Sequence, residues 1–298
     1  MKVLVTGGTG FVGTRLREAQ PNWVYISSKD CDLVDYGDTL RTIKRVKPDA
    51  ILHLAGLVGG IKENFTKQAE FYDANIYINT NVVRAAHQAG VKRVLASLST
   101  CVFPDTADHY PLVEADILSG PPAETNLTYG YTKRALYVQV NAYRHQYGVN
   151  FSTFCPSNVY GPNDNFNIAS SHFVPAMIRK IDQAKQGEVV EFWGTGEPLR
   201  QQLYVDDLAK IIPFLLEHHN TSVPLIVCPD ENLSIKQMIS IFLQNIKKDV
   251  KIKFNNHLDG QYRKDGSNNN FKQLYGEFEF TKFKDGIMKT YEWYKCNE

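Results

Sequence analysis

Residues 3–13 read VLVTGGTGFVG, an apolar run that passes directly into a cluster of glycines, three of which are spaced three residues apart. The apolar run predicts a buried strand, and the residues after it predict a helix that begins at about residue 11. Glycines in such a turn let the backbone come close to a pyrophosphate, and the start of the helix offers that anion unpaired N–H groups and a positive dipole end. Glycine clusters that only close a turn are the alternative. The predicted dinucleotide contacts are Gly7, Gly10, Phe11, Val12 and Gly13.

The same alternation continues through the first half of the chain, where short apolar runs are separated by longer helical patterns. Strands are predicted at residues 2–6, 23–27, 50–54, 94–98 and 151–156. Helices are predicted at residues 39–46, 71–89 and 129–147. Helices of this kind can serve as right-handed crossovers between parallel strands. The expected fold is therefore α/β, a doubly wound parallel sheet of the Rossmann type.

The local composition of the sequence changes after about Gly161, where clusters of Asn, Ser, Gly and Pro separate short mixed segments. We expect a Rossmann domain at residues 1–163, joined by a returning strand and helix near residues 192–216. A smaller C-terminal α/β domain that binds substrate is expected at residues 164–191 and 217–298.

The composition of the 298 residues is that of a globular protein, with 43% hydrophobic and 22% charged residues. The 33 basic and 32 acidic residues nearly cancel, so neither nucleic acid nor a membrane surface is an expected partner. The five cysteines are widely separated and lack the spacing of a zinc site or a disulfide framework, so we expect no metal and a reducing, cytoplasmic location. Because a predicted strand follows Met1 directly, we expect no separate leader, and no apolar run approaches the length of a membrane span.

The end of the second predicted strand bears on the choice of dinucleotide. A site for NAD commonly places an acid there to accept hydrogen bonds from the ribose 2′-hydroxyl. Here Ser28 and Lys29 occupy that place and are suited to a 2′-phosphate instead. The sequence favours NADP, although a lysine with no role beyond the surface is the alternative.

Tyr129 and Lys133 are four residues apart on a predicted helix, which sets both on one face. A nearby cation is expected to lower the pKa of the phenol from about 10, so that Tyr129 can exchange a proton with a substrate oxygen. The pair alone is common in proteins. It gains meaning from Ser99, at the end of the strand before this helix, because ligands bind at the carboxyl ends of strands in such sheets. Tyr131 lacks the spacing.

The glycine turn, Ser99, Tyr129 and Lys133 together resemble the extended short-chain dehydrogenase/reductase family, and the likeness runs from residue 1 to the C-terminus. The resemblance implies an NADP(H)-dependent oxidoreductase that forms a homodimer through the helices at 71–89 and 129–147. It also implies further cofactor contacts at Leu54, Ala55, Gly56, Pro156, Asn158, Val159 and His172.

Several segments resemble one branch of this family more narrowly, the 3,5-epimerase/4-reductases of GDP-4-keto-6-deoxy-mannose. The segments are LAGLVGG at 54–60, SLSTCVFP at 97–104, PSNVYGPNDNFN at 156–167, SHFVPA at 171–176, WGTGEPLR at 193–200 and DGQYRK at 259–264. Two departures from the branch are Gly56, where alanine is more usual, and Asn163, where histidine is frequent. Neither removes a proposed catalytic group.

The resemblance to this branch implies two acid/base groups that invert the carbons beside a ketone, with Cys101 as base and His172 as acid. Apart from the resemblance, a small buried core residue and a locally bonded helix-start residue are the alternatives. Ser99 and Tyr129 are then expected to donate hydrogen bonds to the enolate oxygen, and Lys133 is expected to bind the nicotinamide ribose.

Contacts with the GDP-sugar are implied at Asn158, Arg179, Lys180, Trp193, Arg200 and Lys264. Arginine suits a diphosphate because its planar fork can donate two hydrogen bonds at once. Each cation could instead be solvated at the surface, and Trp193 could belong to the core. Activity on another 4-keto-6-deoxy nucleotide sugar, or a non-catalytic NADP-binding role, are the competing functions.

Overall fold

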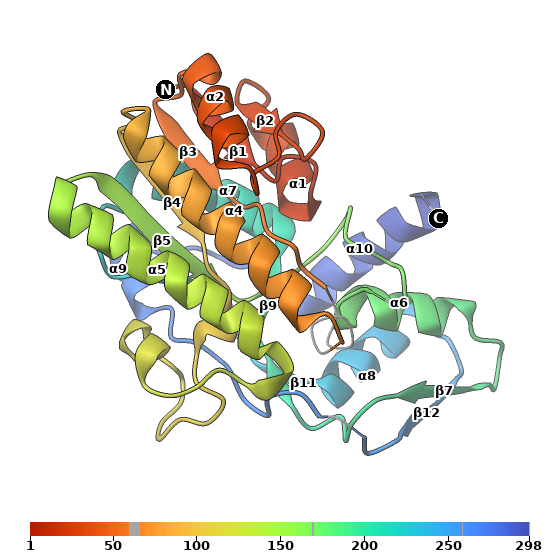
Figure 1. The fold of residues 1–298 in the computed structure, drawn as a ribbon. Helices are drawn as coiled ribbons and strands as arrows, with labels where there is room; N and C mark the ends of the chain where they lie inside the picture. The colour runs from red at the N-terminus through yellow and green to blue at the C-terminus, as the bar shows by residue number, and fades with distance from the viewer. Residues whose placement is uncertain (60–65, 169, 258, 298) are drawn as a thin grey trace.

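A six-stranded, fully parallel sheet forms the centre of the computed structural model, which describes residues 1–59, 66–168, 170–257 and 259–297 (Figure 1). Its strands, from one edge to the other, are β10 (Leu225–Val227), β5 (Asn150–Pro156), β4 (Arg93–Ser97), β3 (Ala50–His53), β1 (Val3–Thr6) and β2 (Val24–Ile26). Nearly every residue of the four inner strands is buried, as expected for a sheet covered on both faces. The five predicted strands and the predicted Rossmann fold are confirmed.

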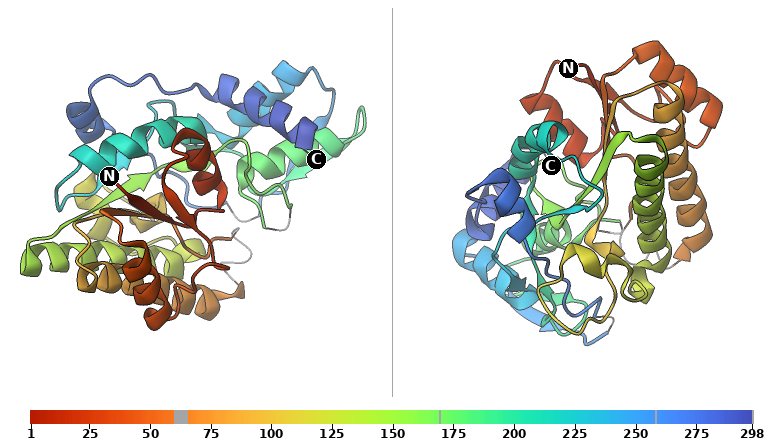
Figure 2. Two further views of the ribbon diagram at one scale, coloured as in Figure 1. Left: turned by 90° about the horizontal axis from the view of Figure 1, so that it is seen from above. Right: turned by 90° about the vertical axis from the view of Figure 1, so that its left-hand side faces the viewer.

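Helices cover both faces of the sheet (Figure 2). One face carries α2 (Tyr36–Val46), α4 (Gln68–Gln88) and α5 (Leu127–Tyr147). The other face carries α1 (Phe11–Ala19), α7 (Val205–His218) and α9 (Asn269–Tyr275). In the right-hand view of Figure 2, α4 and α5 lie on one side of the sheet, and α7 and the C-terminal helices lie on the other. The three predicted crossover helices are confirmed as α2, α4 and α5.

The strand order reverses between β1 and β3. β1 pairs with β2 on one side, through Val5 opposite Tyr25, and with β3 on the other, through Val5 opposite Leu52. The connections that leave the carboxyl ends of β1 and β3 therefore diverge, which is where ligands bind in open α/β sheets. The glycine turn after Thr6 lies at this point.

A smaller α/β body is built on the other side of the molecule from α6 (Phe173–Gln183), α8 (Ile235–Ile246) and α10 (Phe283–Asn297). Three pairs of short strands accompany these helices. The pairs are β6 (Asn158–Tyr160) with β9 (Gln202–Tyr204), β7 (Val189–Phe192) with β12 (Lys251–Phe254), and β8 (Leu199–Arg200) with β11 (Leu233–Ser234). Three 3-10 helices, η1 (Thr100–Val102), η2 (Glu114–Leu118) and η3 (Glu124–Asn126), lie between β4 and α5.

Two elements near the C-terminus pack with the large sheet. Both β10 and α9 fall within residues 217–298, which were expected in the smaller domain. β10 is the edge strand of the large sheet, and Phe271 of α9 is buried in the same core as α7. The three apolar residues of β10 are too few for their pattern to show which core they enter.

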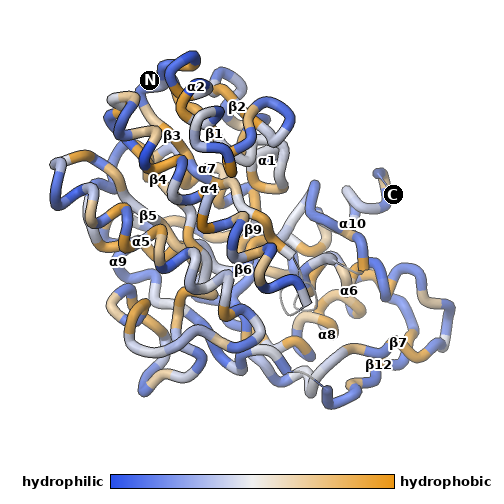
Figure 3. The backbone as a smooth tube through the Cα atoms, in the orientation of Figure 1, coloured by the Kyte–Doolittle hydropathy of each residue, from blue (hydrophilic) through white to orange (hydrophobic). Residues whose placement is uncertain are grey.

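The distribution of hydropathy follows these two bodies (Figure 3). Hydrophobic residues gather along the central strands and on the covered sides of the helices, and hydrophilic residues follow the outer turns. Within the described residues, no helix has the length and apolar character that a membrane crossing requires.

Candidate active site

The glycine turn after β1 has the geometry that a dinucleotide site needs. Gly7 has φ +74°, and a Cβ there would lie 2.9 Å from the backbone nitrogen of Ala55. A Cβ at Gly13 would collide with the carbonyl oxygen of Gly7. α1 begins at Phe11 with no side-chain cap at Gly10 and no acidic residue in its first turn. The helix therefore presents free N–H groups and its positive end to the space in front of the turn.

The segment after β2 presents a cation, Lys29, to the same edge of the sheet. Ser28 and Lys29 are exposed, and Lys29 makes no ion pair with any residue that the structure describes. Asp30 is also exposed, and its carboxylate accepts hydrogen bonds from the backbone nitrogen of Ser27 at 2.8 Å and from the Ser27 hydroxyl at 2.7 Å. These bonds lower the pKa of Asp30. A carboxylate is thus present near the end of β2, but it is hydrogen bonded to Ser27 of its own turn.

Arg17 was not predicted and lies close to these groups. Its guanidinium donates a hydrogen bond to the carbonyl oxygen of Gly8 at 3.3 Å and lies 4.9 Å from the centre of the Tyr25 ring. A second cation therefore joins Lys29 between the glycine turn and β2. The position of Arg17 in the second turn of α1 was the feature of the sequence that could have indicated this contact.

The segment after β3, with Leu54, Ala55 and Gly56, lies beside the glycine turn. The backbone nitrogen of Leu54 donates to the carbonyl oxygen of Thr6 at 3.3 Å, and that of Ala55 donates to the Thr6 hydroxyl at 3.3 Å. A Cβ at Gly56 would lie 3.1 Å from the amide oxygen of Asn75, which explains the departure from alanine. The last glycine of the LAGLVGG motif, Gly60, lies outside the described residues.

A buried hydrogen-bonded chain connects this segment to the helix that carries Tyr129. His53 contacts the Thr6 hydroxyl through Nδ1 at 2.8 Å and the amide oxygen of Asn79 through Nε2 at 3.1 Å. The amide nitrogen of Asn79 then donates to the carbonyl oxygen of Thr132 at 3.3 Å. Burial, and then the charge of Lys133, lower the pKa of His53 to about 3, so the imidazole is neutral. Sequence reasoning missed this chain because its members are far apart in the sequence.

Tyr129 and Lys133 lie on the first two turns of α5, as predicted. The ammonium of Lys133 donates to the carbonyl oxygen of Ser97 at 2.8 Å and lies 5.8 Å from the centre of the Tyr129 ring. Burial lowers the pKa of Lys133 to about 8, and Lys133 is 2% exposed. Tyr131 is 43% exposed and lies against Arg134 instead.

The prediction that Lys133 lowers the pKa of Tyr129 is wrong for this structure. Burial raises that pKa, and the nearby thiols of Cys101 and Cys155 raise it further. The reason is that desolvation disfavours the phenolate, while the ammonium is turned to the Ser97 carbonyl. Tyr129 is therefore a phenol at neutral pH and is able to act as an acid.

Cys101 and Ser99 are held against the start of α5. Ser99 caps η1, with its hydroxyl accepting a hydrogen bond from the backbone nitrogen of Cys101 at 3.4 Å. A Cβ at Gly130 would lie only 2.5 Å from the carbonyl oxygen of Cys101, so the helix reaches η1 closely because residue 130 has no side chain. Cys101 is half-buried, whereas Cys155 is fully buried beside it.

Two cations from the smaller body face Cys101. Arg200, in β8, and Lys264 both interact electrostatically with the Cys101 thiol. Burial lowers the pKa of Arg200 to about 10 and also lowers that of Lys264. His172 immediately precedes α6 without capping it, so the alternative of a locally bonded helix-start residue has no support. Its pKa is lowered by desolvation and then by the charge of Lys264. The structure thus brings together five predicted residues, namely Tyr129, Cys101, Arg200, Lys264 and His172.

The other predicted substrate and cofactor residues lie around this group in different ways. Pro156 ends β5, while Asn158 and Val159 begin β6. Lys180 donates to the carbonyl oxygen of Glu191 at 3.0 Å, which brings it toward the end of β7. Trp193 follows β7 and is 54% exposed, so it does not belong to the core.

Arg179 contacts the loop before α6. Its guanidinium donates to the carbonyl oxygen of Phe166 at 3.0 Å, in the loop before α6. A backbone carbonyl bound in this way fixes the loop that carries His172.

Asp259 is a site residue that sequence reasoning missed. Its carboxylate accepts hydrogen bonds from the backbone nitrogen of Thr195 at 2.9 Å and from the Thr195 hydroxyl at 2.6 Å. It also interacts electrostatically with Arg200. Asp259 thereby fixes the turn between Trp193 and Arg200. The Gly-Thr-Gly sequence indicates a turn, but Asp259, which binds that turn, lies more than sixty residues further along the chain.

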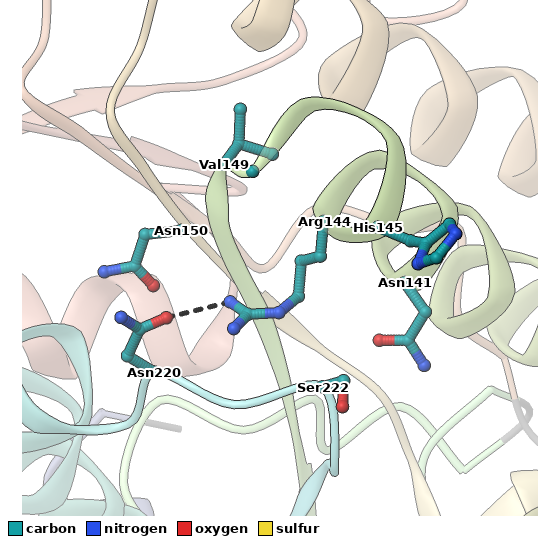
Figure 4. A pocket seen from close by; sticks show the side chains of 8 residues that line it. Asn141, Arg144, His145, Val149, Asn150, Asn220 and Ser222 are labelled. Carbon is teal, nitrogen blue, oxygen red and sulfur yellow. Dashed lines mark hydrogen bonds between the residues drawn. The ribbon is translucent and has the colours of Figure 1, made fainter.

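A polar cavity of about 520 Å³ lies at the opposite end of the sheet (Figure 4). It is formed where α5 ends and β5 begins, and the guanidinium of Arg144 donates there to the amide oxygen of Asn220 at 2.9 Å. None of the predicted site residues lines it. The chemistry is therefore assigned to the carboxyl ends of the strands, where the glycine turn, Tyr129 and Cys101 lie.

Comparison with known proteins agrees with this geometry. Residues 3–227 match the family described as the NAD dependent epimerase/dehydratase family, and the chain belongs to that family.

The similarity extends to particular members over the whole chain. The chain is 36% identical to a probable GDP-L-fucose synthase of Drosophila melanogaster, over 98% of this chain and 97% of that protein. It is 35% identical to the GDP-L-fucose synthase of Dictyostelium discoideum, over 99% and 95% of the two chains. The crystal structure of a GDP-L-fucose synthetase from Naegleria fowleri bound to NADP superimposes with a TM-score of 0.89, at 31% identity, over 99% of this chain and 94% of that one.

Proposed function

We propose that this protein is a GDP-L-fucose synthase, which epimerises GDP-4-keto-6-deoxy-D-mannose at C3 and C5 and then reduces it at C4 with NADPH. The observation that carries the proposal is the close approach of η1, which contains Cys101, to the start of α5, which contains Tyr129, at the carboxyl end of the sheet. Full-length similarity to GDP-L-fucose synthases supports the same activity. A binding protein without activity would not need this set of acid/base groups.

The residues of the cofactor side fit NADP. Side chains at Gly7 and Gly13 would collide with the backbone of Ala55 and of Gly7, so the tight turn requires glycine at both positions, and the start of α1 is free of acids. Ser28, Lys29 and the unpredicted Arg17 would meet the 2′-phosphate, and Lys133 the nicotinamide ribose. When bound, the cofactor supplies the hydride.

The epimerisation is assigned to Cys101 and His172. The C4 ketone acidifies the hydrogens at C3 and C5, so that Cys101 as thiolate removes a proton from carbon. His172 returns a proton to the opposite face. Arg200 and Lys264 are the cations that interact electrostatically with Cys101. The hydroxyls of Ser99 and Tyr129 hold the oxygen on which the enolate charge develops.

The reduction is assigned to Tyr129 and Lys133. Because burial keeps Tyr129 protonated, the phenol can give its proton to the C4 oxygen. Lys133, with a pKa of about 8, is mostly charged at neutral pH and stabilises the resulting phenolate. The two groups lie on one face of α5, which fixes their mutual position.

The substrate contacts are proposed to come from the smaller body. Arg200 and Lys180 would bind the diphosphate, with Arg179 beside Lys180 on α6, and exposed Trp193 would cover the sugar or the base. Asn158 would meet the sugar near the nicotinamide. The smaller domain at 164–191 and 217–298, apart from β10 and α9, is proposed to supply this half of the site together with Trp193 and Arg200 of residues 192–216.

A homodimer is proposed to form through α4 and α5. These helices expose several large side chains on their outer faces, as expected for a surface that another copy covers. The side chains are Tyr72, Tyr77, Tyr131 and Val138. A cytoplasmic location is proposed in addition, supported by five free cysteines.

Incubation in D2O tests the epimerisation separately from the reduction. With GDP-4-keto-6-deoxy-mannose and no NADPH, the wild-type protein should exchange deuterium into C3 and C5, read by NMR. Cys101→Ser and His172→Asn should slow the exchange by about 100-fold or more, the order expected for an acid/base group. Exchange at the wild-type rate in both variants would contradict the assignment.

A further inference from the structure

The hydrogen-bonded chain through His53 joins the segment after β3 to helix α5 inside the large body. It runs through the Thr6 hydroxyl, the His53 ring, the Asn79 amide and the Thr132 backbone. Each of these four residues is at most 1% exposed. The first contact follows from strand register, since Thr6 in β1 lies directly opposite His53 in β3. No step of the proposed mechanism uses this buried imidazole.

The direction of every hydrogen bond in the chain follows from its last member. A backbone carbonyl oxygen only accepts, so the amide nitrogen of Asn79 faces the Thr132 carbonyl, at 3.3 Å. The Asn79 amide oxygen therefore faces His53 and requires a proton on Nε2, at 3.1 Å. In a neutral ring, Nδ1 then accepts from the Thr6 hydroxyl at 2.8 Å. The hydroxyl oxygen in turn accepts from the backbone nitrogen of Ala55 at 3.3 Å, so every donor points from Ala55 toward Thr132.

A protonated His53 ring would break this order. Its Nδ1 would donate to the Thr6 oxygen, which already accepts from Ala55. The Thr6 hydroxyl proton would then be unpaired, because this hydroxyl contacts no other acceptor among the residues that the structure describes. The positive charge of Lys133 also opposes a second cation at His53. The chain is therefore complete only with the neutral ring that carries its proton on Nε2.

The far end of the chain binds the backbone between the two groups assigned to the reduction. The Thr132 carbonyl that Asn79 contacts belongs to the peptide group that joins Thr132 to Lys133. The Thr132 hydroxyl donates to the carbonyl oxygen of Tyr129 at 2.8 Å. Asn79 thus holds the turn of α5 that carries both Tyr129 and Lys133.

The near end of the chain lies beside the glycine turn. The Thr6 carbonyl accepts from the backbone nitrogen of Leu54 at 3.3 Å, while the Thr6 hydroxyl accepts from that of Ala55. A separate amide of α4, Asn75, exchanges two hydrogen bonds with the backbone of Leu57, each at 2.9 Å. Loss of the His53 chain would consequently leave the segment after β3 attached to α4.

We propose that His53 is a positioning residue for the reduction, which ties the cofactor segment after β3 to the turn of α5 that carries Tyr129 and Lys133. The inference rests on the proposed function, in which Tyr129 gives a proton to the substrate and Lys133 binds the nicotinamide ribose. Because its ring stays neutral, His53 acts by fixing positions and not by transferring a proton.

The tautomer of His53 is tested in the protein without substrate or cofactor. In 15N-labelled protein, the chemical shifts of the ring nitrogens show which of them carries the proton. His53→Gln identifies the signals of this ring among the eight histidines. We expect a ring protonated at Nε2 alone, unchanged between about pH 5 and 8, where an ordinary histidine titrates. A ring protonated at Nδ1, or one that titrates in this range, would overturn the proposal.

The variants break the chain without removing a group that contacts substrate. Asn79→Leu keeps the size of the side chain and removes both hydrogen bonds. His53→Leu removes the ring, whereas His53→Gln keeps an N–H donor within reach of Asn79. Asn81→Leu is the matched control, because Asn81 lies on the same helix, is 6% exposed, and donates instead to the carbonyl oxygens of Leu33 and Val34, at 3.0 Å and 2.9 Å.

The kcat for NADPH oxidation with GDP-4-keto-6-deoxy-mannose should fall by about 10- to 100-fold in Asn79→Leu and His53→Leu, because the reacting groups are no longer held in place. The KM for NADPH should stay within about 3-fold, since the glycine turn is untouched. His53→Gln should recover most of the loss, and the double leucine variant should be no slower than the slower single one. A wild-type kcat in Asn79→Leu, an effect confined to KM, or an equal loss of kcat in Asn81→Leu would overturn the proposal.

Hydrogen exchange measures the same coupling without turnover. Peptides that cover the start of α5 should exchange faster in Asn79→Leu and His53→Leu than in the wild type, and at the wild-type rate in Asn81→Leu. An unchanged rate there in Asn79→Leu would contradict the coupling. Absence of turnover in the wild type would instead refute the proposed function, and the tautomer and the exchange rates would still decide the role of His53.

Discussion

The close approach of α5 to η1 leads to a specific prediction for Gly130→Ala. The new methyl group would lie 2.5 Å from the carbonyl oxygen of Cys101 and 2.8 Å from Cβ of Pro122. Carbon–oxygen contacts normally begin at about 3.3 Å, so η1 and α5 must separate by roughly 0.8 Å. Both neighbours belong to backbone or to a rigid ring, so neither can rotate away.

Two consequences follow from that displacement. Overpacking of this size costs about 1–3 kcal/mol of unfolding free energy. Tyr129 and Cys101 would also move apart, and a misplacement on the order of 1 Å can cost about 100-fold in rate. Turnover with GDP-4-keto-6-deoxy-mannose and NADPH should fall by about that factor.

The assay pairs turnover with thermal unfolding, and its control is Gly37→Ala in α2. There the nearest atoms to a new Cβ are the ends of the Arg41 and Asp35 side chains, at 3.2 Å. The control should keep wild-type activity and gain up to about 1 kcal/mol, since alanine favours helix. Wild-type turnover and stability in Gly130→Ala would refute the close packing and its role in the site.

Three further predictions concern separate parts of the site. Cys101→Ser should still oxidise NADPH but yield a product without normal inversion at C3 and C5, which NMR would detect; normal L-fuco product would count against Cys101 as base. The reduction rate should decline as the pH rises through about 8, because Lys133 is charged below that value and neutral above it. Lys133→Met should lose most of the activity, and the activity that remains should no longer decline near pH 8. A decline that survives in Lys133→Met would show that another group causes it. Lys29→Ala and Arg17→Ala should each raise the KM for NADPH by about 5- to 30-fold, which corresponds to about 1–2 kcal/mol for a charge-assisted hydrogen bond. The KM for NADH should stay unchanged. Equal effects on both cofactors would contradict a contact with the 2′-phosphate.

The large sheet could be predicted because its signals are local. An apolar run such as Val94–Leu98 is buried on both faces of a parallel sheet, so composition alone marks it as a strand. The glycine turn is also marked locally, because Gly7 has φ +74° and a Cβ at Gly13 would collide with the carbonyl oxygen of Gly7. Short edge elements such as β10 carry too few residues for any pattern to assign them.

The environment of the site could be predicted only in part. The sequence pairs Tyr129 with Lys133, but the pKa of the phenol depends on burial by η1 and β5, which spacing does not reveal. Gln261 and Asp259 act through partners far away in the chain, at Pro104 and Thr195. Such contacts come from how the two bodies meet, and a single sequence holds no periodic signal for them.

The most direct test of the central claim is conversion of GDP-4-keto-6-deoxy-mannose by the wild-type protein, with NADPH oxidation followed by absorbance and the product identified by NMR. We expect one NADPH to be consumed per molecule of GDP-L-fucose formed. If NADPH is left untouched, or if the product keeps the manno configuration at C3 and C5, the assigned function is wrong.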